Sequence, residues 1–443
     1  MRKFNTTDYA KYLPAVNDYA KGVLQEMKTG RSFPVSITQE DLIFWEKGNN
    51  LFHYPCILHS AGLHKVGSWP NNAVYRSNKE DVLIFGDSGG YQIGTGTMKG
   101  ITSFDDKMNS AEALERWDTI ADKVRNWVTS LSESMTTHAI TLDIPLWLIH
   151  DASTKSAFKD CTFEQLTKLT VENLHYLEAN RTGKTKWHNV VHGITTEEFE
   201  HWWEAIKQFK FDGWALAGGA GADGGLYQML YTILRMREDD AFEEGRTSLH
   251  VLGVSTLKWA VFFTAIQNAL REQYGSFNVT YDSSSPFVMA AEHNKAYISP
   301  ELGDSLSSWR ISAAKVEQGF SHRGSTENFP YNNSPIGKLL TLGDLNVQGS
   351  ETAKVHFDSM SRYLIANHNV WVMLDAIERA NKAAFDDSSQ KRVPENFSKC
   401  IRLIDQAFKA DDWRAYLIAN KKFFDEVTPC AYATEVQEVQ GAE

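Results

Sequence analysis

The sequence predicts an α/β fold and, within that class, a (β/α)8 TIM barrel with an insertion and C-terminal helices. From about residue 80, short β-branched or apolar runs alternate with longer segments of helical period. This alternation is typical of βα units around a parallel sheet. A doubly wound sheet fits it as well, but a region of roughly 250 to 350 residues suits a barrel with insertions.

The expected strands are short and mostly apolar. In chain order they are YPCILH (54–59), VLIFG (82–86), HAITLD (138–143), NVVHGI (189–194), GWALA (213–217), HVLGV (250–254) and NVTYD (278–282).

The expected helices lie between these strands. One follows Ser110, and two others begin with the capping-box patterns Thr162 with Gln165 and Thr195 with Glu198. LYQMLYTILRM (226–236) and TLKWAVFFTAIQNALREQ (256–273) complete the set.

Three domain segments follow from these patterns. Residues 1–40 are expected to form an N-terminal lead segment and 41–384 the barrel domain. Within the barrel domain, 296–350 is rich in Ser, Gly, Asn and Pro and is interpreted as an irregular insertion. Helical periodicity at 361–384 and 397–427 predicts closing helices, with 385–443 as a C-terminal helical extension.

The charge balance limits the possible partners. The chain has 45 Lys and Arg residues against 56 Asp and Glu, a formal net charge of −11, which excludes nucleic-acid binding through a global basic field. No stretch approaches the ~18 consecutive apolar residues of a membrane span, so we expect a cytoplasmic protein with no membrane partner.

No metal or cofactor is expected. The four cysteines are scattered without a C-x-x-C pair, and the group His53, Cys56, His59 and His64 spans a strand whose alternate residues face opposite sides. The glycine-rich stretch WALAGGAGADGGLY (214–227) lacks the G-K-[ST] ending of a phosphate-binding loop.

Catalytic groups of a barrel lie where strands end. The residues at the expected strand ends include three carboxylates, a histidine and several glycines: Asp87, Asp143, His192, Gly193, Gly218, Gly219, Gly253 and Asp282. A single Asp at such a position is commonly a helix cap or turn residue, but three on one rim indicate a reactive site.

Two short motifs carry most of the expected chemistry. In FGDSGGYQIG (85–94), Asp87 is a candidate acid or base, Ser88 and Gly89 form a turn, and Tyr91 is a candidate stacking ring for a flat ligand. In TYDSSSP (280–286), small hydroxyl residues leave the Asp282 carboxylate uncrowded, which makes it a candidate nucleophile or a cap.

An ordered set of motifs resembles the tRNA-guanine transglycosylase superfamily. The motifs are DSGGYQ, LDIP, VVHGI, DGWALAGG, HVLGV, TYDSSSP and SRYLIANHNVWVMLDAIERANK, the last with the pair His368 and Asn369. The resemblance implies a barrel enzyme without a cofactor that exchanges a guanine base in a nucleic acid for a free 7-deazaguanine.

The resemblance also implies a role for each site residue. Asp282 is the covalent nucleophile, Asp87 the general acid and base, and Asp143 the acceptor for the guanine edge. A backbone N–H of Gly218 or Gly219 binds O6, and the target base is flipped out of the stack. The full set of substrate-binding residues is Asp143, His192, Gly193, Gly218, Gly219, Tyr91, Ser88, Gly89 and Gly253.

Departures from the family pattern favour DNA over tRNA as the substrate. The chain has His192 where a glutamine is usual, lacks the arginine-bearing stretch after Asp282, and has 298–350 in place of the zinc subdomain. It therefore looks more like the zinc-less DNA-guanine transglycosylases of phages and bacterial DNA-modification systems, with tRNA as the alternative. The candidate DNA-binding cations are Lys295, Arg310, Lys315, Arg323 and Lys338.

Two other classes of function remain open. One is a barrel glycosidase in which Asp87 and Asp282 form the carboxylate pair and Trp147, Trp202 and Trp203 line a sugar cleft. The other is a non-catalytic, nucleic-acid-binding subunit of a transglycosylase pair.

Overall fold

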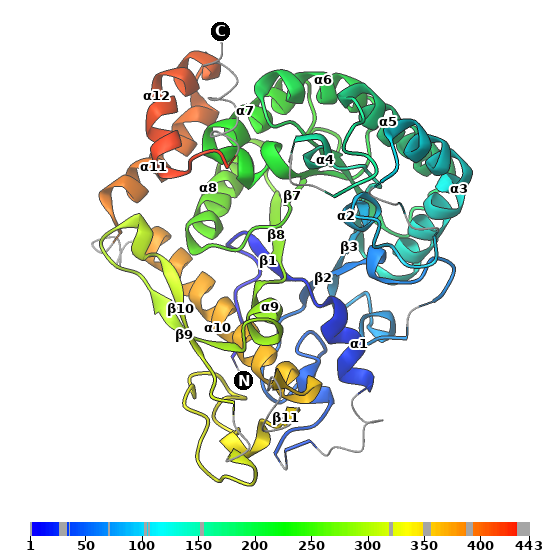
Figure 1. The fold of residues 1–443 in the computed structure, drawn as a ribbon. Coiled ribbons are helices and arrows are strands. Elements are labelled where there is room, and N and C mark those ends of the chain that lie inside the picture. The colour runs from blue at the N-terminus through cyan, green and yellow to red at the C-terminus, as the bar shows by residue number, and fades with distance from the viewer. Residues whose placement is uncertain are drawn as a thin grey trace.

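The barrel fold is confirmed. The computed structural model describes residues 2–25, 33–34, 36–69, 71–101, 104, 107–150, 155–318, 322–348, 356–386 and 393–431. Eight parallel strands form one sheet in the order β1-β8-β7-β6-β5-β4-β3-β2, with helices around it (Figure 1). The strands are β1 (Lys11–Pro14), β2 (Cys56–Ser60), β3 (Leu83–Asp87), β4 (His138–Ile140), β5 (Lys186–Val191), β6 (Gly213–Leu216), β7 (Ser248–Val251) and β8 (Asn278–Ser283).

The sheet closes just beyond the end of β1. Ala15 and Leu58 form a parallel bridge, and the Val16 N–H donates to the Leu58 carbonyl at 2.9 Å. On its other side, β1 pairs with β8, where Leu13 lies opposite Asp282. The predicted lead segment thus contributes a barrel strand, which sequence analysis missed because four residues ending in Pro14 show no periodicity.

The helices that follow the strands form the outer layer. They are α1 (Asn17–Gln25), α2 (Gly90–Gly94), α3 (Ser110–Met135), α4 (Trp147–His150), α5 (Phe163–Asn180), α6 (Thr196–Ile206), α7 (Gly225–Glu238), α8 (Leu257–Tyr274) and α9 (Ser285–Ala291). The chain then continues into α10 (Ser359–Phe385), α11 (Glu395–Lys409) and α12 (Trp413–Val427).

Side-chain caps set the helix starts close to the predicted positions. The capping box of Thr162 with Gln165 is present. Thr195 accepts from the Glu198 N–H as predicted, but the Glu198 carboxylate accepts from Ile194 N–H at 2.9 Å instead of the cap residue. The cap of α3 is Asn109, one residue before the predicted Ser110.

The insertion contains more regular structure than predicted. β9 (Lys295–Glu301) and β10 (Arg310–Lys315) form an antiparallel hairpin, and β11 (Val347–Gln348) pairs with β12 (His356–Phe357). Most residues of the hairpin are only partly buried, so its strands lack the apolar alternation by which a strand is recognised in sequence.

His368 and Asn369 of α10 hold this insertion in place. The His368 Nε2–H donates to the Tyr297 carbonyl at 2.7 Å, and the Ser334 hydroxyl donates to His368 Nδ1 at 2.7 Å. Asn369 accepts from the Tyr297 N–H at 2.8 Å and donates to the Pro286 carbonyl at 3.1 Å. Burial lowers the pKa of His368 to about 4, so this ring is neutral at pH 7.

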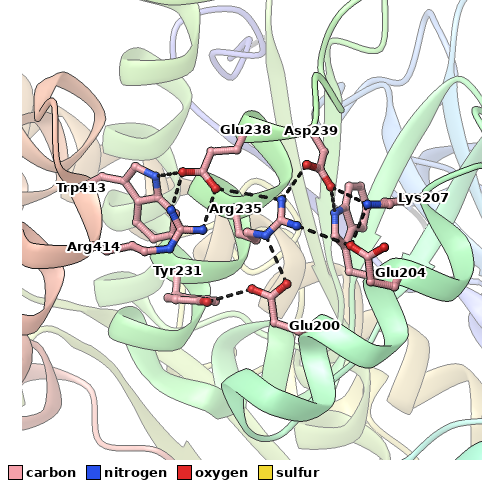
Figure 2. A network of polar contacts seen from close by, with 10 residues as sticks. Glu200, Glu204, Lys207, Tyr231, Arg235, Glu238, Asp239, Trp413 and Arg414 are labelled. Carbon is pink, nitrogen blue, oxygen red and sulfur yellow. Dashed lines mark hydrogen bonds and ion pairs between the residues drawn. The ribbon is translucent and has the colours of Figure 1, made fainter.

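The C-terminal extension is two helices where the sequence pattern suggested one. Asp412 interrupts the helical run because its carboxylate caps α12, accepting from the Ala415 N–H at 2.9 Å. An ionic network joins α12 to the barrel wall (Figure 2). In it, Glu238 accepts from Trp413 Nε1 at 2.7 Å and from Arg414 at 2.6 Å.

Among the helices that the structure describes, none is long and apolar enough to cross a membrane.

Candidate active site

Three aspartates meet at the C-terminal rim of the barrel. Asp87 is the last residue of β3, Asp282 lies near the end of β8, and Asp143 follows β4. The charges of Asp143 and Asp282 both act on Asp87 and raise its pKa, so each of these two carboxyl groups lies within electrostatic reach of Asp87. The structure thus brings together the three carboxylates that the sequence places at separate strand ends.

The surroundings of Asp87 favour its protonated form. Desolvation is the largest cause of its raised pKa, and the two neighbouring carboxylates add to it. The Ser60 hydroxyl donates to Asp87 Oδ2 at 2.6 Å and opposes this shift. The pKa of Asp87 is higher in the folded than in the unfolded protein. Its contribution to stability is therefore complete at a pH below the unfolded-state pKa and is lost as the pH rises through the folded-state pKa.

Asp282 is held from one side. The Gly253 N–H donates to its Oδ1 at 3.0 Å, and His250 Nε2 lies 3.3 Å from the same oxygen. His250 is fully buried, with its Nδ1 at 2.9 Å from the Thr280 hydroxyl and its ring stacked on Phe85. These contacts fix one carboxylate oxygen of Asp282 and leave Oδ2 available for chemistry.

Asp143 is paired with His192. The His192 Nε2–H donates to Asp143 Oδ2 at 2.8 Å, and both side chains are buried. The His192 ring also packs edge-on against Trp202, at 4.8 Å between ring centroids. One Asp143 oxygen is therefore oriented by the His192 ring.

The glycines let the rim loops pack against the carboxylates and against each other. A Cβ on Gly90 would lie 2.8 Å from Asp143 Oδ1, and one on Gly219 would lie 2.4 Å from Ile194 Cα. Gly89 adopts a left-handed φ of 87° as the cap of α2. Gly193 and Gly218 stand just after β5 and β6 on the same rim.

Two aromatic rings lie beside this site. Tyr91 is 59% exposed and its ring centroid is 5.4 Å from that of Trp147. Tyr91 follows Gly90, the residue whose Cβ would lie 2.8 Å from Asp143 Oδ1, so its exposed ring belongs to the rim turn that packs on this carboxylate.

The sugar cleft proposed for a glycosidase is wrong for two of its three tryptophans. Trp202 and Trp203 are buried, at 0% and 1% exposure. Their indole N–H groups donate to the Val190 carbonyl and to Asp239. They are wall residues of the barrel because they lie on the inward face of α6.

The predicted DNA-binding cations are spread over the insertion. Lys295 and Lys315 lie opposite each other in the β9–β10 hairpin. Arg310 is neutralised by Glu301, its Nε donating to the carboxylate at 2.7 Å. Arg323 and Lys338 are exposed on the segment between β10 and β11.

Two of the histidines near β2, His59 and His64, lie against each other. His59 Nε2 and His64 Nε2 are 2.6 Å apart, and burial lowers their pKa values to about 3 and about 4. Within the described part of the chain, no three His, Cys, Asp or Glu side chains are placed to hold a metal ion. The expectation that the chain binds no zinc stays a prediction.

Three residues of this site were not predicted from the sequence: Ser60, His250 and Asn17. Ser60 lies opposite Asp87 in the β2–β3 register, and a polar residue at a strand end was the signal that could have found it. His250 is a lone histidine inside an apolar strand, and its place in the site is recognised only from its contact with Asp282 in the structure. Asn17 accepts a hydrogen bond from the Ser60 N–H at 3.0 Å. Ser88 was predicted as a contact; its side chain is buried, and its hydroxyl has no hydrogen-bond partner among the described residues.

Comparison of the chain with models of known protein families and with curated proteins gives no match.

Proposed function

We propose that this protein is a base-exchange transglycosylase that replaces guanine in DNA with a 7-deazaguanine, such as 7-cyano-7-deazaguanine. The observation that carries the proposal is the meeting of Asp87, Asp143 and Asp282 on one rim, with the pKa of Asp87 raised. A site that exchanges a base needs a nucleophile, a proton donor of raised pKa and an acceptor for the base edge, and these three carboxylates can divide that work.

The first half of the reaction forms a covalent intermediate. Asp282 Oδ2 attacks C1′ of the target nucleoside while Oδ1 remains bound to the Gly253 N–H. The bond from C1′ to N9 of guanine breaks, and the protonated Asp87 gives its proton to the departing base. Neutral guanine leaves, and the sugar stays esterified to Asp282.

The second half reverses these steps with another base. Asp87, now ionised, takes the N9 proton of the incoming 7-deazaguanine as that nitrogen attacks C1′. The ester bond to Asp282 breaks and its carboxylate is regenerated, so each turnover consumes one free base and releases one guanine. General acid and base catalysis of this kind contributes roughly 10²–10⁴-fold.

Asp143 selects the base in both halves. A carboxylate accepts hydrogen bonds and donates none, and the guanine edge offers the N1–H and the exocyclic amine as donors. His192 holds Asp143 Oδ2 from the opposite direction and so fixes the orientation of the carboxylate. Tyr91 stacks on the ring, and a backbone N–H of Gly218 or Gly219 donates to O6.

DNA is favoured as the substrate because of what the chain lacks. Reading an anticodon loop requires side chains that bind splayed single-stranded bases, and the stretch expected to carry them is missing after Asp282. α9 and the hairpin β9–β10 follow instead, anchored to α10 by His368 and Asn369. Phosphate contacts from this side would position a duplex from which one guanine is extruded.

The test is an exchange assay with radiolabelled guanine on double-stranded DNA, single-stranded DNA and tRNA in parallel. We expect exchange with DNA and little or none with tRNA at the same salt concentration. Exchange with tRNA alone would return the protein to the tRNA branch of the superfamily. If no exchange occurs with any of the three substrates, the proposed reaction is contradicted.

A further inference from the structure

A pocket outside the three-carboxylate site lies between α1, α9 and α10, which lie side by side (Figure 1). Its volume is about 360 Å³, within the usual ~300–1,000 Å³ range of small-ligand sites. The side chains that define its character are Asp18, Tyr19, Lys21, Phe287, Arg362 and Tyr363. None of them belongs to the catalytic groups described above.

Positive charge is in excess on the wall of this pocket. Lys21 and Arg362 stand against the single carboxylate of Asp18, in a chain whose net charge is −11. Among the described residues the Arg362 guanidinium has no ion pair, and its Nε is buried without a hydrogen-bond partner. A planar cation with unused donors is suited to a phosphate group.

Aromatic rings form the rest of the pocket. The Tyr19 ring packs against Phe287 at 5.1 Å and against Tyr363 at 5.6 Å between centroids. Gly22 lets the Tyr363 ring lie directly on α1, because a Cβ at this position would come within 1.8 Å of the Tyr363 hydroxyl oxygen. Aromatic rings beside cations are the usual means of holding a base or sugar next to its phosphate.

The pocket adjoins the reactive rim through both of its shorter helices. α9 begins two residues after β8, the strand that carries Asp282. α1 follows β1 onto the same rim, and its first residue Asn17 accepts from the Ser60 N–H, while the Ser60 hydroxyl binds Asp87. Two of the helices that line the pocket therefore begin close in sequence to the strand ends that form this rim.

We propose that the pocket binds a nucleotide of the DNA strand next to the one that reacts. Lys21 and Arg362 contact its phosphate, and the Tyr363 and Phe287 rings support its sugar or base. This inference rests on the proposed function, and it gives the anionic rim a local source of positive charge. It also moves one of the expected phosphate contacts from the 296–350 insertion to α1 and α10.

The experiment measures the salt dependence of binding for Arg362→Ala and Lys21→Ala with a guanine-containing DNA oligonucleotide, duplex and single-stranded. Each variant should lower the slope of log K against log salt by about 0.9 for duplex or about 0.7 for single strands. Arg379→Ala is the matched control, because Arg379 lies on the same α10, pairs with Asp375 at 2.9 Å and is about 25 Å farther along the helix. Its slope should equal that of the wild type.

The outcomes separate this pocket from the chemistry. If the wild type releases guanine from DNA but Arg362→Ala and Lys21→Ala leave both the salt slope and the KM for DNA unchanged, the pocket proposal is overturned and the reaction stands. If the wild type releases no guanine while both variants flatten the slope, the pocket stands and the reaction fails. Failure of the wild type to bind DNA overturns the pocket.

Discussion

Replacing Asp282 by Asn isolates the proposed covalent step with little disturbance of the fold. The amide keeps an oxygen that can accept the Gly253 N–H, which lies 3.0 Å from Asp282 Oδ1, and it has nearly the same volume as the carboxylate. The free energy of unfolding should therefore stay within about 0.5–1 kcal/mol of the wild type. The substitution also removes one of the two carboxylates that raise the pKa of Asp87.

The activity should behave differently from the stability. An amide is too weak a nucleophile to form the ester, and loss of an enzyme's nucleophile typically costs on the order of 10⁴-fold or more in rate. Guanine release from labelled DNA gives the rate, and a denaturing gel shows the covalent adduct. Asp411→Asn makes the same chemical change at an exposed position beside α12 and should leave both readouts at the wild-type level.

One result would refute this reasoning directly. A covalent protein–DNA adduct formed by Asp282→Asn at wild-type yield would show that another group attacks C1′. Loss of activity accompanied by a large drop in unfolding free energy would show instead that Asp282 supports the fold.

Three further predictions concern the remaining groups. Asp143→Ala should raise KM for the incoming base much more than it changes the unfolding free energy, because two base donors lose their acceptor at a cost of about 1–3 kcal/mol, and an unchanged base affinity would contradict the role of Asp143. Guanine release should fall as the pH rises through the raised pKa of Asp87. Asp143→Asn removes one of the charges that raise this pKa, so the fall in rate should move to lower pH. A fall at the same pH as in the wild type would argue against Asp87 as the acid. His368→Leu should lower the unfolding free energy in urea by about 2–5 kcal/mol, since the Ser334 hydroxyl and the Tyr297 carbonyl lose their partner, and a stability equal to the wild type would show that these groups find other partners.

The convergence of the three aspartates could be predicted because it depends on one geometric rule. Parallel barrel strands all end on the same face, so residues at expected strand ends share a rim however far apart they lie in sequence. Asp87 and Asp282 satisfy this rule as members of β3 and β8, and Asp143 does so just beyond β4. The rule predicts on which face of the barrel a residue lies, but not which side chains contact one another there. Ser60 and His250 were missed for this reason, because each contacts an aspartate on the neighbouring strand.

The strands and tryptophans that were predicted wrongly have a common physical cause, because the local sequence pattern does not show tertiary packing. β1 is too short to show a period, and β9 and β10 are only partly buried, so their sequences do not alternate. Trp202 and Trp203 were assigned to a cleft because sequence does not show which side of a helix meets the barrel wall. Burial in this protein is decided by tertiary packing in all of these cases.

His368 and Asn369 connect α10 to the chain segment that follows β8. Both side chains are fully buried, and each makes its hydrogen bonds to the backbone or hydroxyl groups of the segment after Asp282. The Asn369 amide spans from the Pro286 carbonyl in α9 to the Tyr297 N–H in β9, and therefore fixes the exit of the chain from β8, the strand that carries Asp282. In the reaction that we propose, the Asp282 carboxylate must hold its direction toward C1′ closely, so we expect a pair that rigidifies this exit to act on catalysis through position alone.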